Sequence, residues 1–323
     1  MCKKLHEEHK NLMLYTNESG LLGIVTSKTL WASHTSFLND SEEIVGFLNR
    51  VLPNILQPEF ERYVESSAEL STLVRTARQW GIDLQDSWFR KMVDGLTEAE
   101  RRAQDHYVTS FCTTDDPWIS EHGLLSQWRG YGPDGGYAII FDTKELASLL
   151  TAEGRIYHEE TILVGDVQYD MAELSKVQDK KVLECIQYVR EAFLAHLETG
   201  DIERFIPAFE RITILSELCK HRGFAEEKEV RIVVSEPSVE VGPDPSNQSG
   251  KSYRRAHSYL RDGAVVPCIH LFEDQTSNAL PIRRVIIGPH PEKQQREKAV
   301  EILLRNHGVN AEVSVSDTPF RGK

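Results

Sequence analysis

The chain is poor in cysteine, and its few thiols are scattered. Its 323 residues include 5 cysteines, an odd number, and no two of them form a Cys-x-x-Cys pair. Scattered thiols are typical of a protein that is kept reduced in the cytoplasm, where disulfides are rare. The nearest Cys/His pair, Cys268 and His270, is explained by alternation along a strand, so we expect no bound metal.

Excess positive charge and long apolar runs are also lacking. The net charge of −13 argues against a general nucleic-acid binder or a membrane-surface binder, since both need a basic face. No segment approaches the ~20 apolar residues that a membrane span requires. The charged segment 1–8 lacks the apolar core of a secretory signal. We therefore expect a cytoplasmic protein that does not bind membranes.

The stretch from Phe224 to Val234 is acidic at its start and β-branched at its end. Its second half favours a strand, and side chains two apart on a strand share a face. Glu227, Glu229 and Arg231 should then point the same way and line a cleft with nearby aromatic residues. Two carboxylates beside a guanidinium can position a nucleophile and stabilise a developing cation. The same pattern also fits an exposed strand with an ordinary Glu–Arg ladder.

A glycine-rich loop at 130–136 follows Trp128 and Arg129 and contains Tyr131. Glycines allow a ligand to approach the backbone closely, and the aromatic and arginine side chains suit a nucleotide or nicotinamide ring. A plain turn that needs positive φ angles explains the same glycines.

Three further groups of polar residues have two interpretations each. Ser110 can brace a carboxylate or bond to a neighbour, and Asn39-Asp40 can orient a ligand hydroxyl or cap a helix. Arg254, Arg255 and Arg261 can contact phosphate, but we expect a solvated surface in so acidic a chain.

Hydrophobic periodicity predicts strands before, between and after two helical blocks. We expect strands at 11–15, 30–33, 107–112, 137–141, 157–169, 227–234, 264–272, 283–287 and 311–316. We expect helices at 21–26, 42–51, 59–80, 86–95, 97–104, 118–128, 143–150, 172–197, 202–221 and 291–306, with a break at Pro53. The fold class is therefore α+β. Residues 1–323 form a single domain, whose strand-rich core is interrupted by helical insertions at about 42–104 and 171–222.

Short motifs spread from about Leu14 to Arg321 resemble the bacterial family DUF2971, which is named for its unknown function. They are Tyr15-Thr16-Asn17, Leu30-Trp31-Ala32-Ser33, Phe37-Leu38-Asn39-Asp40, Ser110-Phe111-Cys112, Gln127-Trp128-Arg129-Gly130-Tyr131-Gly132, Glu227-Lys228-Glu229-Val230-Arg231 and Val285-Ile286-Ile287-Gly288.

A second and weaker likeness is to the ADP-ribosyltransferases, whose split-sheet core carries three signatures. The Ser-Thr-Ser-like strand resembles Ser110-Phe111-Cys112, and the Glu/Gln-x-Glu motif resembles Glu227-Lys228-Glu229. At the first signature, Leu14-Tyr15-Thr16 stands where a related family has His-Tyr-Thr. Leucine cannot hydrogen-bond a cofactor.

This second resemblance implies an enzyme that cleaves NAD and transfers ADP-ribose to an unknown macromolecular acceptor. Glu229 would stabilise an oxocarbenium-like state through a ribose hydroxyl, and Glu227 would orient the acceptor. The implied NAD-binding residues are Tyr15, Thr16, Ser110, Trp128, Arg129, Tyr131 and Arg231. The alternative is a non-catalytic module, on the same scaffold, that senses a nucleotide or binds a partner. A nuclease is a third interpretation, but no carboxylate spacing specifies a metal site.

Overall fold

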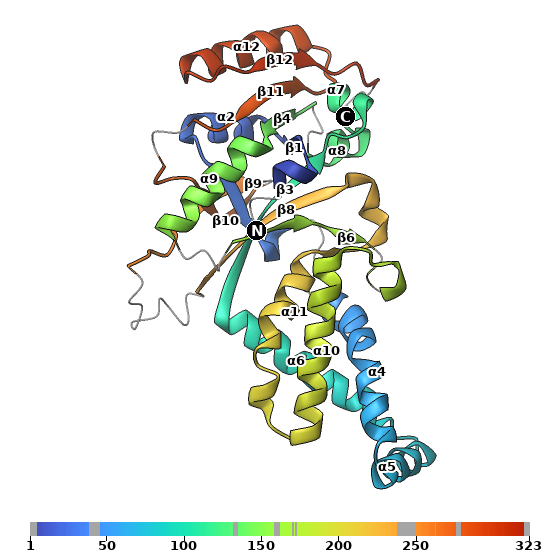
Figure 1. Ribbon diagram of the computed structural model, residues 1–323. Coiled ribbons are helices and arrows are strands. Elements are labelled where there is room, and N and C mark those ends of the chain that lie inside the picture. Colours follow the sequence, from blue (N-terminus) through green and yellow to red (C-terminus); the bar gives the residue numbers. More distant parts are fainter. Residues whose placement is uncertain are drawn as a thin grey trace.

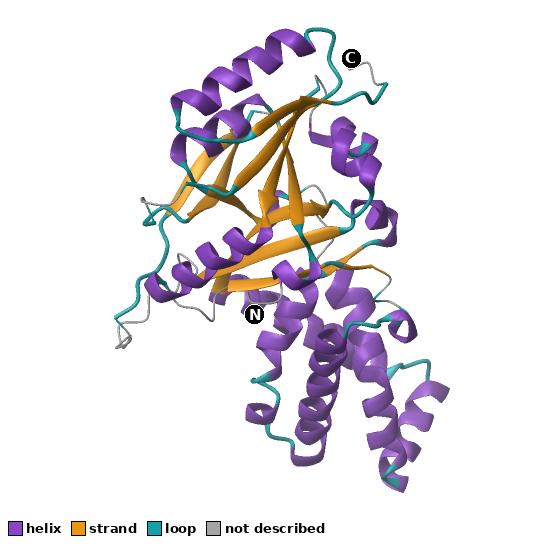
Figure 2. Ribbon diagram, turned by 45° about the horizontal axis from the view of Figure 1, so that its top comes forward, coloured by secondary structure: helices purple, strands orange, loops and turns teal. Residues whose placement is uncertain are grey.

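The computed structural model describes residues 5–38, 46–131, 135–157, 162–169, 171, 173–237, 250–261, 263–275 and 279–319. It has the α+β architecture that the sequence predicts, with a large mixed sheet, helices packed against it and a helical bundle projecting from one side (Figures 1 and 2). Asn39 and Asp40 lie outside the described residues. None of the described helices is long and apolar enough to cross a bilayer.

Ten strands of the described chain form the main sheet. Eight follow one path, in the order β12-β11-β4-β1-β3-β2-β10-β9, while β8 pairs with β3 and β5 pairs with β8. Their bounds are β1 Asn11–Thr16, β2 Leu30–His34, β3 Gln104–Thr113, β4 Tyr137–Asp142, β5 Ile162–Asp166, β8 Glu229–Pro237, β9 Ala256–Arg261, β10 Ala264–Leu271, β11 Ile282–Ile287 and β12 Glu312–Val315. A second, two-stranded sheet joins β6 (Gln168–Tyr169) to β7 (Cys219–Lys220).

Strand β3 is the branch point of the main sheet. One of its edges pairs with β8 along its length, from Gln104 to Cys112. The other edge is shared, because β2 pairs with Val108 and β1 pairs with Cys112. Among the described residues, 109–111 have no strand partner on that edge. Strands β1 and β2 therefore pair with opposite ends of the same edge of β3, and the sheet is split between them.

The main core fills one face of this sheet. Alternate residues such as Leu12, Phe111 and Ile232 are buried there, and they pack with apolar residues of α9 (Thr143–Ile156), α12 (Lys293–Asn306) and α2 (Glu18–Ser27). Asp142 caps α9, because its carboxylate accepts a hydrogen bond from the backbone of Glu145 at 2.9 Å. The short helices are α1 (Leu5–Glu8), α7 (Pro117–His122), α8 (Leu125–Tyr131), η2 (Thr35–Phe37) and η7 (Arg222–Glu227).

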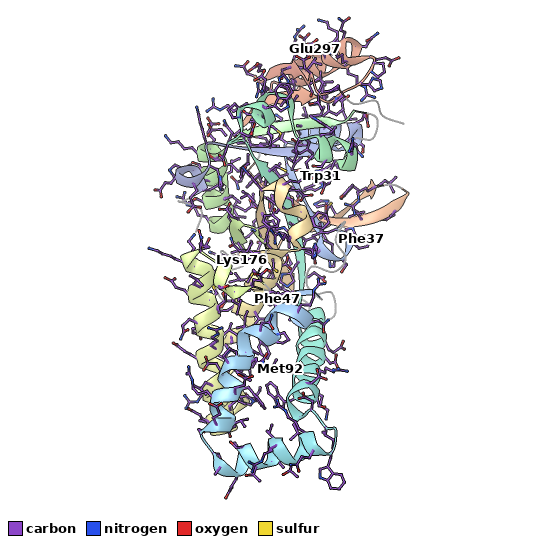
Figure 3. The ribbon with its side chains drawn as sticks, turned by 90° about the vertical axis from the view of Figure 1, so that its right-hand side faces the viewer. Trp31, Phe37, Phe47, Met92, Lys176 and Glu297 are labelled. Atoms are coloured by element: carbon purple, nitrogen blue, oxygen red, sulfur yellow. The ribbon has the colours of Figure 1, made fainter. Side chains whose placement is uncertain are left out.

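The two predicted helical insertions come together into a single helical arm. The first supplies η3 (Phe47–Val51), α4 (Leu52–Glu65), α5 (Ala68–Gln79) and α6 (Leu84–Ala103); the second supplies η5 (Leu174–Lys176), α10 (Lys180–Thr199), η6 (Ile202–Arg204) and α11 (Ala208–Glu217). Figure 1 shows these helices below the sheet, and Figure 3 shows the arm from the side, with Phe47 at its base and Met92 within it. The arm has its own hydrophobic cluster, built from both insertions around Ile55, Val189 and Phe193.

Several predicted helix boundaries in the first insertion are wrong, for local reasons. The expected break at Pro53 is absent from the described helix, because proline is tolerated in the first turn, where its missing N–H costs no hydrogen bond. The expected helix 59–80 is divided into α4 and α5. The Ser67 side chain caps the start of α5 by accepting a hydrogen bond from the backbone N–H of Leu70. Conversely, the expected helices 86–95 and 97–104 are the single helix α6, and the predicted start at Thr97 lies inside it.

Other predicted helices are divided as well, and the strands β7 and β9 were not predicted. Gly123, with φ +75°, separates α7 from α8 within the expected helix 118–128. The expected helix 202–221 contains η6, α11 and the short strand β7. Strand β9 was missed because its apolar residues are few and its burial alternates only between exposed and half-buried.

The division of the arm between two distant segments predicts how the chain can be cut. A fragment of residues 1–104 lacks α10, against which α4 packs, and so exposes the part of the arm's hydrophobic cluster that the first insertion supplies. We expect limited proteolysis to give no stable fragment made only of residues 1–104. Recovery of such a fragment with a cooperative thermal transition would show that the first insertion folds independently.

Candidate functional site

A cavity of about 430 Å³ occupies the split between β1 and β2. The unpaired middle of β3 forms its floor, and α2 and α8 contribute to its walls. Its polar and aromatic lining includes Tyr15, Thr16, Trp31, Ser33, Ser110, Tyr131, Glu227, Glu229, Tyr259 and Arg261. This volume and this mixture of rings with a few polar groups are those of small-molecule sites in general.

Two carboxylates meet at one wall of the cavity, though not as strand alternation predicted. Glu229 begins β8, but Glu227 is the last residue of the 3₁₀ helix η7. Lys228 between them has φ +43°, in the left-handed region, and this bend brings the two carboxylates together. Both accept a hydrogen bond from the ammonium of Lys220, each at 2.8 Å. The expectation that Glu227 lies on the strand is wrong, but its proximity to Glu229 is confirmed.

Arg231 shares the face of β8 with Glu229, as predicted, but it lies behind the carboxylate instead of lining the cavity. Its Nε donates to Glu229 at 2.8 Å, and its Nη1 donates to the carbonyl oxygen of Glu217 at 2.7 Å. The side chain is only 1% exposed. Arg231 therefore connects β8 to the end of helix α11 in the arm.

The electrostatics of this cluster favour full ionisation. Burial acts to raise the pKa of Glu229, but the neighbouring charges of Arg231 and Lys220 outweigh it and lower the pKa to about 2. Burial likewise acts to lower the pKa of Lys220, but Glu229 and Glu227 raise it above its ordinary value. Glu229 is thus anionic at neutral pH, and the two carboxylates face two cations.

Glu227 is the more accessible carboxylate of the pair. Its side chain is 15% exposed, against 4% for Glu229. Among the described residues its only hydrogen-bonding partner is Lys220, which contacts Oε2. The other oxygen, Oε1, is available to a molecule in the cavity.

The expected residues on the first strand and in the aromatic loop separate into two groups. Tyr15, Thr16 and Tyr131 line the cavity, whereas Trp128 and Arg129 do not. Trp128 is 1% exposed and lies against the ring of Tyr15, with 4.9 Å between ring centroids. Its Nε1 donates to the carbonyl oxygen of His122 at 3.0 Å, so Trp128 supports the wall from behind.

The described end of the glycine-rich loop has a packing role, whereas residues 132–134 lie outside the described residues. Gly135, with φ +106°, lies against Pro289 and Gly288, where a Cβ on Gly288 would meet the Gly135 carbonyl oxygen. Gly130 lines the cavity. The plain-turn interpretation therefore explains the end of the loop, where the chain enters β4.

Ser110 and Cys112 stand opposite the ion cluster on β3. Ser110 pairs with Arg231 and Cys112 pairs with Glu229, so all four side chains lie on the same face of the sheet. Both β3 residues line the cavity. Burial raises the pKa of the Cys112 thiol, so this cysteine is protonated at neutral pH and is a poor nucleophile.

A second aromatic wall escaped the functional interpretation of the sequence. Trp31 lines the cavity and lies against Tyr259, with 5.3 Å between ring centroids. The Tyr259 hydroxyl is 2.8 Å from the hydroxyl of Ser33, and Arg261 donates to the carbonyl oxygen of Phe37. The alternation of Trp31 and Ser33 on a predicted strand could have identified them as residues on one face of the site. No sequence pattern pointed to Lys220, because it lies in the second insertion, outside the strands that were predicted to carry the site.

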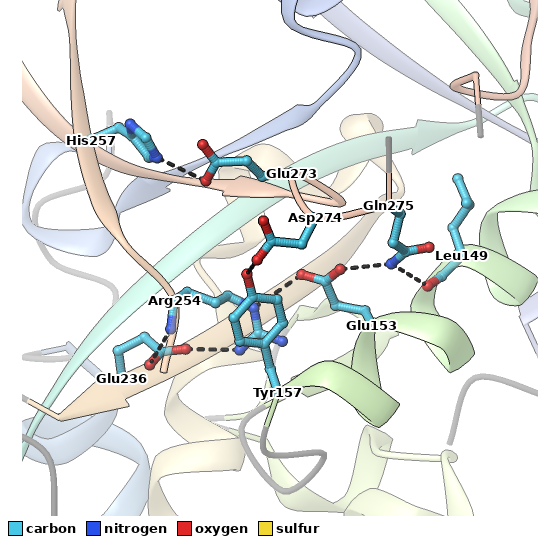
Figure 4. Close-up of polar contacts among 9 residues, drawn as sticks. All are labelled: Leu149, Glu153, Tyr157, Glu236, Arg254, His257, Glu273, Asp274 and Gln275. Atoms are coloured by element: carbon cyan, nitrogen blue, oxygen red, sulfur yellow. Dashed lines mark hydrogen bonds and ion pairs between the residues drawn. The ribbon is translucent and has the colours of Figure 1, made fainter. Parts of the chain in front are cut away.

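The expectation of a solvated surface at Arg254 is wrong. Arg254 is 8% exposed and forms ion pairs with Glu236 at 2.8 Å and Glu153 at 3.2 Å (Figure 4). Its guanidinium also lies over the ring of Tyr157, 4.5 Å from the centroid. Arg255, by contrast, is exposed. The acidic partners are more than a dozen residues away in the chain, so the charge pattern around Arg254 in the sequence does not reveal them.

The ion cluster predicts that Glu229→Gln is destabilising. Removal of one charge leaves Lys220 and Arg231 undercompensated in a buried site, which costs about 3–5 kcal/mol of unfolding free energy. We expect urea unfolding at pH 7 to show this loss. The exposed neighbour Glu226, substituted as Glu226→Gln, is the control and should stay within about 0.5 kcal/mol of the wild type.

The lowered pKa of Glu229 also sets the pH dependence of this difference. Its stabilising contribution is present above the ordinary pKa of 4.5 and is lost as pH falls toward the folded value of about 2. The difference in unfolding free energy between wild type and Glu229→Gln should therefore become smaller below pH 4.5. Equal stability of the two proteins at pH 7 would contradict the structural role assigned to Glu229.

Comparison with known proteins bears on part of this region. No curated protein and no solved structure matches the chain. A family model does match, over a segment that begins in α8, beside the cavity, and ends in β8, just after Arg231. The expected resemblance is confirmed over this segment: residues 127–232 match the model of DUF2971, a protein family of unknown function.

Proposed function

We propose that this chain is an NAD-cleaving enzyme that transfers ADP-ribose to a macromolecular acceptor. The observation that carries the proposal is the pair of carboxylates, Glu227 and Glu229, at the wall of a cavity in a split sheet. The weaker likeness of Ser110-Phe111-Cys112 and Glu227-Lys228-Glu229 to transferase signatures supports it. We place the reaction in the cytoplasm, because the few scattered cysteines of the chain are typical of a reducing compartment.

The lining of the cavity suits a dinucleotide. Trp31, Tyr131 and Tyr259 offer ring faces for nicotinamide or adenine, and hydroxyl groups of Thr16 and Ser110 suit ribose. Arg261 is a cation for phosphate at the same cavity. Tyr15 is less available, because its hydroxyl already accepts a hydrogen bond from the backbone of Leu124 at 2.7 Å.

The reaction needs no redox chemistry and no metal. The bond between nicotinamide nitrogen and ribose C1′ breaks, and nicotinamide leaves with the electron pair. An acceptor nucleophile then bonds to C1′ and loses its proton. The transition state is cationic at the ribose, so a fixed anion nearby lowers its energy. In this proposal Glu229 supplies the fixed charge, while the accessible Oε1 of Glu227 orients the acceptor and takes its proton.

The second candidate is a non-catalytic module that binds a nucleotide. Two features of the site favour it. The charge of Glu229 is compensated by Arg231 at 2.8 Å and by Lys220 at 2.8 Å, which weakens its effect on a developing cation. Leu14, at the position of the first transferase signature, is 9% exposed and packs in the main core. A leucine there offers no hydrogen bond to nicotinamide.

Glu227→Gln separates the two candidates with little effect on folding. The side chain is partly exposed and bonds only to Lys220 among the described residues, so its charge can be removed without stranding Arg231. We expect nicotinamide release from NAD, measured with cell extract as the source of acceptor, to fall on the order of a hundredfold. NAD affinity and melting temperature should change little.

Glu226→Gln, one residue away and exposed, is the matched control and should keep the wild-type rate. Full activity of Glu227→Gln would remove this carboxylate from the mechanism. A wild-type protein that binds NAD without releasing nicotinamide would establish the binding module in place of the enzyme.

A further inference from the structure

Two histidines and a glutamate gather beside Trp31, outside the lining of the cavity. His257 on β9 and His270 on β10 stack with 4.1 Å between ring centroids, and Glu273 follows the end of β10. The Nε2 atom of His257 lies 3.0 Å from a carboxylate oxygen of Glu273 (Figure 4). One ligand atom from each of the three residues lies within 4.8 Å of the others.

We propose that His257, His270 and Glu273 form a binding site for Zn²⁺ or a chemically similar divalent ion. Two imidazoles and one carboxylate are a donor set that Zn²⁺, Co²⁺ and Ni²⁺ accept. The exposed fractions of His257 and Glu273, 29% and 32%, leave a path for the ion and room for water as a further ligand.

The two histidines are held in place by the sheet and by Trp31. β9 and β10 are paired antiparallel, and the register sets His257 opposite Cys268, so His270 is its diagonal neighbour on the same face. The ring of His270 also stacks on Trp31, with 5.3 Å between centroids and 4° between planes. Cys268, the residue that suggested a Cys/His pair in the sequence, has no part in this group.

The glutamate is positioned by the segment that carries it. Phe272, just before it, has φ +72°, which is unusual for a bulky residue and turns the chain as it leaves β10. The two residues after Glu273 are held by hydrogen bonds in the network of Figure 4. Asp274 accepts a hydrogen bond from the Tyr157 hydroxyl at 2.5 Å, and Gln275 donates to Glu153 at 2.7 Å. A ligand on a fixed backbone loses little freedom when it binds an ion.

Ion binding requires a small adjustment of the rings. The two imidazole planes are 9° from parallel, so their lone pairs do not converge on one point. Ligand atoms around a tetrahedral zinc lie roughly 3.4 Å apart, given zinc–nitrogen bonds of about 2.1 Å. Rotation about the Cβ–Cγ bonds, which are soft torsions in histidine, brings them together. The ion would then tie the edge strand β9, which carries Tyr259 and Arg261 to the cavity, to the anchored Glu273.

The test is a zinc titration of chelator-treated full-length protein by calorimetry, with Co²⁺ absorption as a second readout. We expect one Zn²⁺ to bind per chain, and Co²⁺ to show the visible bands of a low-coordinate site with nitrogen ligands. Even residues that only support metal ligands are worth about 10–100-fold in affinity, so His257→Ala, His270→Ala and Glu273→Gln should each weaken binding at least about tenfold.

The matched control is His9→Ala. His9 belongs to the other described group of possible ligands, with Glu8 and Asp166, and its removal should leave zinc affinity unchanged. Glu273→Gln keeps the size of the side chain, so its thermal melt without metal should match the wild type and show that lost binding is not lost folding. The proposal is overturned if the wild type takes up no Zn²⁺, or if His9→Ala abolishes binding while the three site variants retain it. The three residues would then form only an ion pair beside an aromatic stack.

Discussion

The contact on which the rest of the structure depends is the buried ion cluster of Glu229, Arg231 and Lys220. It joins the three parts of the molecule that matter most: the central strand β8, the last helix of the arm and the wall of the cavity. Arg231 bonds to both Glu229 and the carbonyl oxygen of Glu217, at 2.8 and 2.7 Å. Removing water from these charges is costly, so the cluster is stable only while every member is paired. This condition fixes the orientation of Glu229.

The arm therefore does more than extend the fold. Its two insertions are far apart in the sequence, yet they share one hydrophobic cluster. Its last helix brings Glu217 to the sheet, and Lys220 follows on strand β7. The arm and the wall of the cavity are thus connected by the hydrogen bond from Arg231 to Glu217 and by the ion pairs of Lys220 with the two carboxylates.

The same cluster has one property that favours the enzyme and one that favours the non-catalytic module. Cations at 2.8 Å keep Glu229 ionised, which a transition-state anion requires, but they also compensate its charge. Glu227 is less affected by this compensation than Glu229, because only Lys220 binds it among the described residues. It shares Lys220 with Glu229, yet it lies outside the strand, lines the cavity and uses only one of its two oxygens to bind Lys220. The split of the sheet supplies the space, because β1 and β2 leave the middle of β3 uncovered on one edge.

The sequence by itself determined the α+β class, the strands that carry the site apart from β9, and the carboxylates at its wall. Alternation placed Glu229 and Arg231 on one face of β8, because the two-residue period of a strand is a local property of a few consecutive residues. The proximity of Glu227 was predicted for the wrong reason, since the left-handed turn at Lys228 has no signature in its side chain.

Only the tertiary structure decided what surrounds those residues. Lys220 comes from the end of the arm, Arg254 finds Glu153 across the fold, and His257 meets Glu273 through the pairing of β9 and β10. These contacts join residues 9 to 101 positions apart. They arise from packing and strand register, and neither can be read from charge or periodicity along the chain. The sequence predicts which groups are polar, whereas the fold decides which of them are paired, buried or free to meet a ligand.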